Sequence, residues 1–89
     1  MKLKENLLLR EVAGMFVVVA AGTAAADFNG ILTLNESGAA LWRQLEDNAD
    51  RKGLVDYLLR EYNVDEETAS KDVDLFLEKL RAANCLQEN

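Results

Sequence analysis

The side chains that most often perform chemistry are scarce or isolated in this chain of 89 residues. It contains no histidine and a single cysteine, Cys85. An internal disulfide, a zinc site of cysteine and histidine, and catalysis by histidine are therefore all excluded. Ser37 and Ser70 have no histidine to activate them. Cys85 stands beside Leu86 at the end of an apolar pattern, and we expect it to be a small buried hydrophobic residue.

Acidic residues are numerous, but their spacing does not build an acid–base pair. Asp72 and Asp74 are two positions apart, so on a helix they point to different faces and cannot share a proton. Glu66 and Glu67 suit the first turn of a helix, where negative charge is favourable. The glycines are too widely spaced for a phosphate-binding loop. We therefore expect a protein that is not an enzyme and that uses no cofactor and no metal.

A helical pattern near the C-terminus carries a first feature that could bind another molecule. One face of the segment Asp65–Ala83 is apolar, and we assign this face to the core. Leu75 lies on a different side, together with Asp72 and Lys79 at helical spacing. This mixed stripe of apolar and charged residues suits contact with a partner, although a single surface leucine also needs no explanation.

A strand edge is the second such feature. The segment Ile31–Leu34 alternates in the manner of a strand and contains no proline or lysine to block its edge. An unprotected edge is either covered internally or accepts an extended peptide as a further strand. The edge and the stripe that contains Leu75 could together line one groove.

These features require a scaffold of strands followed by helices. Leu7–Ala13 and Met15–Ala21 are apolar runs on either side of Gly14, which predicts a hairpin. Asn29–Gly30 is a turn signal before the third strand, Ile31–Leu34. The sheet is therefore expected to be antiparallel and three-stranded.

Three helices are expected after the strands. Asn35, Asp50 and Asp65 are good N-cap residues, and each precedes an amphipathic pattern. The third helix runs to about Ala83, where Asn84 can adopt the left-handed conformation that ends a helix. The expected fold class is α+β: a winged helix-turn-helix-like domain with an N-terminal three-stranded antiparallel sheet followed by three helices.

Length and charge narrow the class of protein further. The length suits a single domain, 1–89. The formal net charge of −6 opposes nucleic-acid binding, because neutralisation of the phosphates supplies most of the non-specific affinity for nucleic acids. The segment Asp65–Ala83, which would be the recognition helix of a winged helix, has three basic and six acidic residues. A winged-helix DNA-binding regulator stays an alternative. So does a homo-oligomerisation module, such as a homodimer paired through the strand edge.

The N-terminal segment resembles a secretory signal in part. Basic residues precede an almost uncharged stretch, Val12 to Ala26, that ends in three alanines. Against a signal, Glu5 and Glu11 interrupt the basic region, and the valine-rich run favours a strand. No stretch approaches the roughly 20 apolar residues that cross a bilayer. We expect a cytoplasmic protein without a membrane partner, while processing of residues 1–26 stays open.

The order of the motifs resembles that of the PqqD-like family. The sequence LNESGA at 34–39, followed by Trp42 and Leu45, is similar to the family signature LNE[ST]GAxxWxxL. The resemblance extends from about Leu7 to Leu86 and departs from the family at Asn84-Cys85, where Ala-Gly-Leu is common. The later family pattern, Y-x-V followed by D-V-x-x-F-L-x-x-L, matches Tyr62, Val64, Asp72, Val73, Phe76, Leu77 and Leu80.

This resemblance implies a peptide chaperone, also called a RiPP recognition element. Such domains bind the leader region of a ribosomally made precursor peptide and present the peptide to a modifying enzyme, expected here to be a radical SAM protein. In the family, the leader adds a strand beside the third strand and packs on the third helix. Carried over to this chain, the peptide-binding residues are Ile31, Leu32, Thr33, Leu34, Asp72, Leu75, Phe76 and Lys79.

Overall fold

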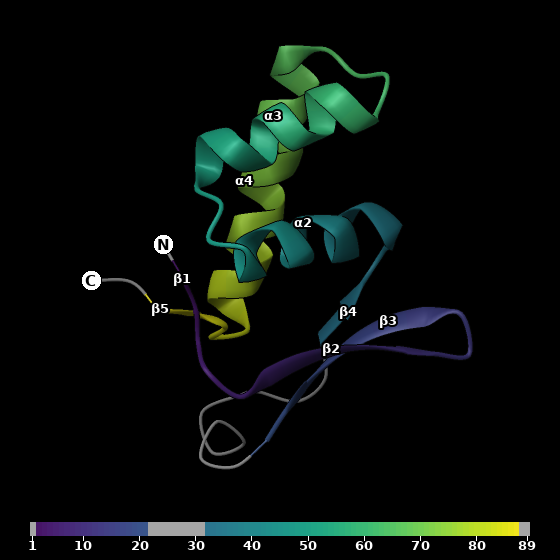
Figure 1. Cartoon of the computed structure of the whole chain (residues 1–89), viewed down its shortest axis with the longest axis vertical. Coiled ribbons are helices and arrows are strands. Elements are labelled where there is room, and N and C mark those ends of the chain that lie inside the picture. Colours follow the sequence, from purple (N-terminus) through teal and green to yellow (C-terminus); the bar gives the residue numbers. More distant parts are fainter. Residues whose placement is uncertain (1, 22–31, 88–89) are drawn as a thin grey trace.

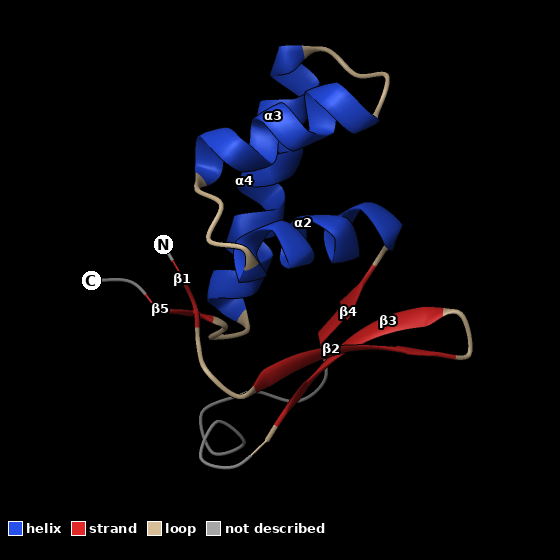
Figure 2. Cartoon of the chain, in the orientation of Figure 1, coloured by secondary structure: helices blue, strands red, loops and turns tan. Residues whose placement is uncertain are grey.

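The chain has a strand-rich first part and a helical second part (Figures 1 and 2). The computed structural model describes residues 2–21 and 32–87. This order confirms the expected α+β, winged helix-turn-helix-like class. The elements are β1 (Lys2–Leu3), β2 (Leu7–Val12), β3 (Met15–Ala20), β4 (Leu32–Leu34), α2 (Glu36–Glu46), α3 (Arg51–Glu61), α4 (Glu66–Ala82) and β5 (Leu86–Gln87).

Strands β2, β3 and β4 form an antiparallel sheet with β3 in the centre. Val12 pairs with Met15, so the hairpin between β2 and β3 has a two-residue loop. Ala13 and Gly14 in this loop both have positive φ, 52° and 79°, as in the tight turns whose twist matches that of paired strands. The predicted hairpin is confirmed, with Ala13 in the turn. The predicted Asn29–Gly30 turn lies outside the described residues.

The three helices begin where the sequence predicts. In each, the backbone N–H three residues after the N-cap donates to the side-chain oxygen of the cap, at 2.7–2.8 Å. This bond satisfies one of the donors that the first helical turn leaves free. Helix α4 ends at Ala82, and Asn84 has a φ of 61°, which confirms the left-handed termination. The donor–cap pairs are Gly38–Asn35, Gly53–Asp50 and Thr68–Asp65.

One face of the sheet and the inner faces of all three helices share a hydrophobic core. Leu7 of β2 and Val18 of β3 both belong to this core, so cleavage after Ala26 would remove the strands β1, β2 and β3 and part of the core. Among the described helices, none is long and apolar enough to span a bilayer. The largest fully buried side chains are those of Val18, Trp42, Leu54, Val73, Leu80 and Cys85.

A second, two-stranded sheet joins the two ends of the described chain. Strand β1 pairs antiparallel with β5, so Leu3 lies opposite Leu86. Each strand has only two residues, which is too short for a periodic pattern, and the sequence therefore does not predict this sheet. Cys85 immediately precedes β5 and is fully buried, as expected. This burial raises the pKa of the Cys85 thiol to about 11.

Candidate functional site

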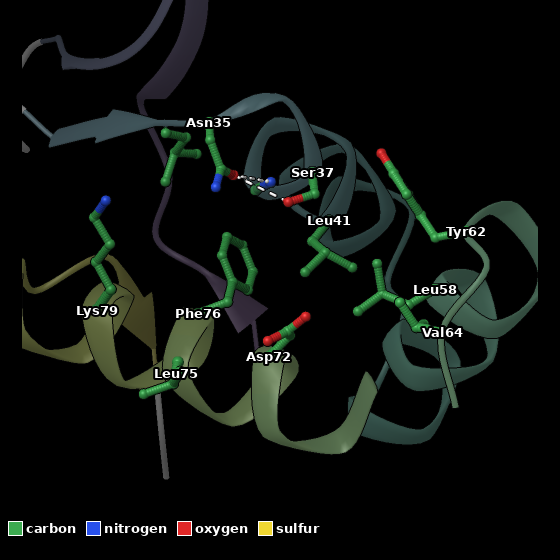
Figure 3. Close-up of a pocket in the computed structure, with 12 residues that line it drawn as sticks. Asn35, Ser37, Leu41, Leu58, Tyr62, Val64, Asp72, Leu75, Phe76 and Lys79 are labelled. Carbon is green, nitrogen blue, oxygen red and sulfur yellow. Dashed lines mark hydrogen bonds between the residues drawn. The ribbon is translucent and has the colours of Figure 1, made fainter. Parts of the chain in front are cut away.

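A pocket of about 400 Å³ lies where the end of β4 meets the three helices (Figure 3). Its floor is apolar and consists of the side chains of Leu41 from α2, Leu58 from α3 and Phe76 from α4. These three residues are 3 %, 4 % and 7 % exposed, so they belong to the core and form the pocket floor. An apolar floor with a few polar groups around it is typical of a binding site.

The end of the pocket beside α3 is formed by Tyr62 and Val64, which follow that helix. Tyr62 is 37 % exposed. Burial of its hydroxyl raises the pKa of Tyr62, and Tyr57, Glu36 and Glu61 add to the rise in that order. The α3 end of the pocket therefore combines a neutral phenol with a negative electrostatic environment.

The residues that connect β4 to α2 form one wall of the pocket and explain the LNESG motif. Leu34 packs into the core, while Oδ1 of Asn35 accepts hydrogen bonds from the Gly38 N–H at 2.7 Å and from Ser37 Oγ at 3.1 Å. A Cβ on Gly38 would lie 3.1 Å from Asn35 Oδ1 and 3.4 Å from Leu34 Cβ. The glycine therefore allows the strand end and the helix cap to approach closely.

Two charged residues of α4 line the pocket two helical turns apart, Asp72 and Lys79. Figure 3 shows them on the same side of the helix with Phe76 between them. The Lys79 ammonium donates a 2.7 Å hydrogen bond to the backbone carbonyl of Thr33 in β4. Asp72 has no hydrogen bond or ion pair with any residue in 2–21 or 32–87.

Within the part of the chain that the structure describes, strand β4 has an open edge. Of the described strands, only β3 pairs with it. The N–H and C=O of one residue in an antiparallel strand point to the same side, and the Thr33 carbonyl points to Lys79 of α4. We conclude that the backbone of Thr33 faces the open edge, next to the pocket that begins at Leu34.

The structure brings most of the residues expected to bind a peptide into one place. Thr33 contributes its backbone carbonyl to this region. Leu32 is 7 % exposed and is a core residue outside the pocket lining, while Ile31 lies outside the described residues. The expected residues that line the pocket are Leu34, Asp72, Leu75, Phe76 and Lys79.

The sequence does not predict the half of the pocket that Asn35, α2, α3 and the segment after α3 provide. The sequence indicates a helix cap at Asn35 and apolar helix faces that contain Leu41 and Leu58, and an apolar residue can be both core and pocket floor. A signal was present, because several of them belong to the two motifs that carry the family resemblance. The missed residues are Asn35, Ser37, Gly38, Leu41, Leu58, Tyr62 and Val64.

Comparisons with known proteins agree with this fold. The structure described as "TbiB1 in Complex with the TbiA(beta) Leader Peptide" has a TM-score of 0.80 at 24 % identity, over 100 % of this chain and 98 % of that chain. The "Lasso peptide synthetase B1 complexed with the leader peptide" has a TM-score of 0.77 at 17 % identity, over 98 % and 96 % of the two chains. At these identities, the likeness concerns the fold. No curated protein matches the chain significantly.

The family assignment rests on a match to a sequence model. The model of the family described as "Coenzyme PQQ synthesis protein D (PqqD)" matches residues 15–86. The matched region begins with β3 and reaches the first residue of β5, so it contains β4 and every residue of the pocket. Since the match covers most of the sequence, the chain belongs to the PqqD family.

Proposed function

We propose that this protein is an adaptor that binds the leader region of a ribosomally synthesised precursor peptide and presents the peptide to a modifying enzyme. The observation that carries the proposal is the open edge of β4, which leads into a pocket with an apolar floor. Both similar structures are of proteins with a leader peptide bound. Proteins of the PqqD family are non-catalytic, in agreement with the expectation that the chain is not an enzyme.

The proposed binding mode is addition of the leader as a strand beside β4. Backbone hydrogen bonds to the strand edge tolerate many sequences, whereas the pocket discriminates among side chains. Thr33 faces the edge with its backbone, and we assign Ile31, Leu32 and Leu34 to the same edge segment. An affinity in the micromolar range, on the order of 8 kcal/mol, allows the leader to be released after modification.

Helix α4 supplies the second side of the proposed groove. Leu75 is 57 % exposed and lines the pocket together with the mostly buried Phe76. A leader side chain that covers them would remove apolar surface from water, which is the main favourable term in most association. Asp72 and Lys79 also line the pocket, and we expect them to contact the flanking positions of the leader.

The modifying enzyme and the location belong to the same proposal. The family resemblance supports a radical SAM enzyme as the partner, in the cytoplasm. The likeness to a lasso peptide synthetase B1 favours a second candidate, the assembly that makes a lasso peptide. Co-purification of the tagged protein with enzymes encoded beside its gene distinguishes these two partners.

Titration of the isotope-labelled protein with a synthetic leader tests the binding proposal. The peptide is taken from the short precursor gene nearest to the gene for this protein. We expect the largest amide shifts at Leu32–Leu34, around Leu75–Lys79 and in residues 35–41, which comprise the N-cap and the first part of α2. Shifts confined to β2, on the opposite edge of the sheet, would contradict the proposed site.

A further inference from the structure

Lys79 connects α4 to the open edge of β4. Its hydrogen bond to the Thr33 carbonyl joins residues 46 positions apart. The Lys79 side chain therefore lies on the path that an added strand would take.

Among the described residues, the ammonium of Lys79 makes fewer hydrogen bonds than it can donate. A lysine ammonium has three donors, and the structure shows one of them bound to Thr33. Within residues 2–21 and 32–87, Lys79 makes no ion pair. A peptide strand beside Thr33 would thus meet a cation with free donors, and a carboxylate is the side chain that pairs best with it.

The opposite charge lies at the other end of the pocket. Asp72 precedes Lys79 by seven residues, which is about 10 Å along the helix axis. Phe76 separates the two charges (Figure 3), and Tyr62 lies at the Asp72 end, where Glu36 and Glu61 add negative charge. The groove is therefore positive beside β4 and negative beside α3.

We propose that Lys79 selects leaders with an aspartate or glutamate on the strand segment beside Thr33, and that Asp72 opposes acidic residues at the α3 end. This inference rests on the proposed function. The pocket begins at Leu34 and continues along α2, so it lies beyond the C-terminal end of β4. A strand antiparallel to β4, like the other pairings of this sheet, passes the pocket first. In the sequence of the leader, the acidic residue is therefore C-terminal to the apolar residue that occupies the pocket.

Selection from a phage-displayed library of random 12-residue peptides tests this charge order. On the wild-type protein, we expect enriched peptides to carry an acidic residue C-terminal to an apolar one. The enrichment should disappear on Lys79→Gln and become an enrichment of lysine and arginine on Lys79→Glu. On Asp72→Asn, the enriched peptides should also include ones with an acidic residue N-terminal to the apolar residue. Lys71→Gln is the control, because Lys71 is exposed on α4 outside the pocket lining.

A double-mutant cycle with one selected peptide measures the proposed pair directly. Replacement of the peptide carboxylate by an amide should weaken binding to the wild type about two- to five-fold, with no change for Lys79→Gln. Equal enrichment of acidic residues on the wild type and on Lys79→Gln would overturn this inference. Selected peptides that bind the groove without any acidic residue would overturn it as well. Either result would leave the proposed function intact. A library without any groove-binding peptide would contradict both.

Discussion

The backbone N–H of Gly38 donates a 2.7 Å hydrogen bond to Oδ1 of Asn35, directly after the last residue of β4. This bond caps the N-terminus of α2 at the point where the open strand edge meets the pocket. The LNESG motif is therefore one structural unit, in which Leu34 anchors the strand, Asn35 caps the helix and Gly38 provides the space for both.

We expect Asn35→Ala to lower the free energy of unfolding by about 1 kcal/mol, because it removes the N-cap acceptor of α2. Urea unfolding followed by the fluorescence of the buried Trp42 measures the change. Asn35→Asp, which retains an acceptor, is the matched control and should remain close to the wild type. An alanine variant as stable as the wild type would show that the cap does not contribute to stability.

The sequence predicts the helices and the hairpin because their signals are local. An N-cap residue such as Asp50 or Asp65 acts within three positions, and the hairpin needs only two strands around Gly14. Leu75 is also predicted from its neighbours, since helical spacing alone separates it from the core face, and it is 57 % exposed. These features do not depend on how the helices pack together.

The features that the sequence does not predict depend on that packing. Strands β1 and β5 are defined by their pairing across the whole chain, and two residues carry no pattern. The bond from Lys79 to Thr33 depends on the placement of α4 beside β4. Leu41 of α2 and Leu58 of α3 form the pocket floor only because the packing of these helices brings both residues to the same pocket as Phe76 of α4. Such contacts are tertiary, so a single sequence does not reveal them.

Acidic pH should destabilise the protein through two carboxylates. Arg51 donates to both carboxylate oxygens of Asp74, at 2.8 and 3.1 Å, and its hydrogen bond is the main cause of the lowered pKa of Asp74. The Thr68 N–H lowers the pKa of Asp65. Since both pKa values are lower in the folded state, their stabilisation is present above about pH 4 and is lost as the pH falls through the folded-state pKa values.

Urea unfolding at pH values between about 2 and 6 measures this loss. Asp74→Asn should make the decline below about pH 4 shallower. Arg51→Gln should do the same, and the double variant should show no further change, because both substitutions remove the same pair. An unchanged decline in all three variants would exclude the Arg51–Asp74 pair as a cause.

The buried thiol of Cys85 should react only after the protein opens. Its pKa is raised by burial from 9.0 to about 11, so almost no thiolate is present at pH 8. We expect slow labelling by a disulfide reagent in buffer and fast labelling in urea. Stability should also fall between about pH 9 and 11, where the unfolded thiol ionises and the folded thiol does not. Cys85→Ala should abolish the contribution of this thiol to the loss of stability at alkaline pH.

Leu75→Asp should weaken leader binding at least ten-fold, because it removes an apolar contact and adds charge to the groove. A buried leucine contributes about 1.5–3 kcal/mol, which corresponds to a ten-fold effect or more. Leu75 is 57 % exposed, so the fold should be retained. Leu59→Asp is the matched control, since Leu59 is 37 % exposed on α3 and does not line the pocket. Calorimetry measures the affinity of each variant for the leader. Equal losses of affinity in both variants would show that Leu75 does not belong to the site.

Backbone methylation of the leader distinguishes strand addition from binding by side chains alone. An added strand directs every second N–H toward β4 and the others toward solvent. We expect N-methylation to weaken binding at alternate positions, most strongly at the amide that donates to the Thr33 carbonyl, by about ten-fold. Thr33→Val keeps the backbone and should bind the unmodified leader normally. A leader that tolerates methylation at every position would show that it does not pair with β4, whatever the pocket contributes.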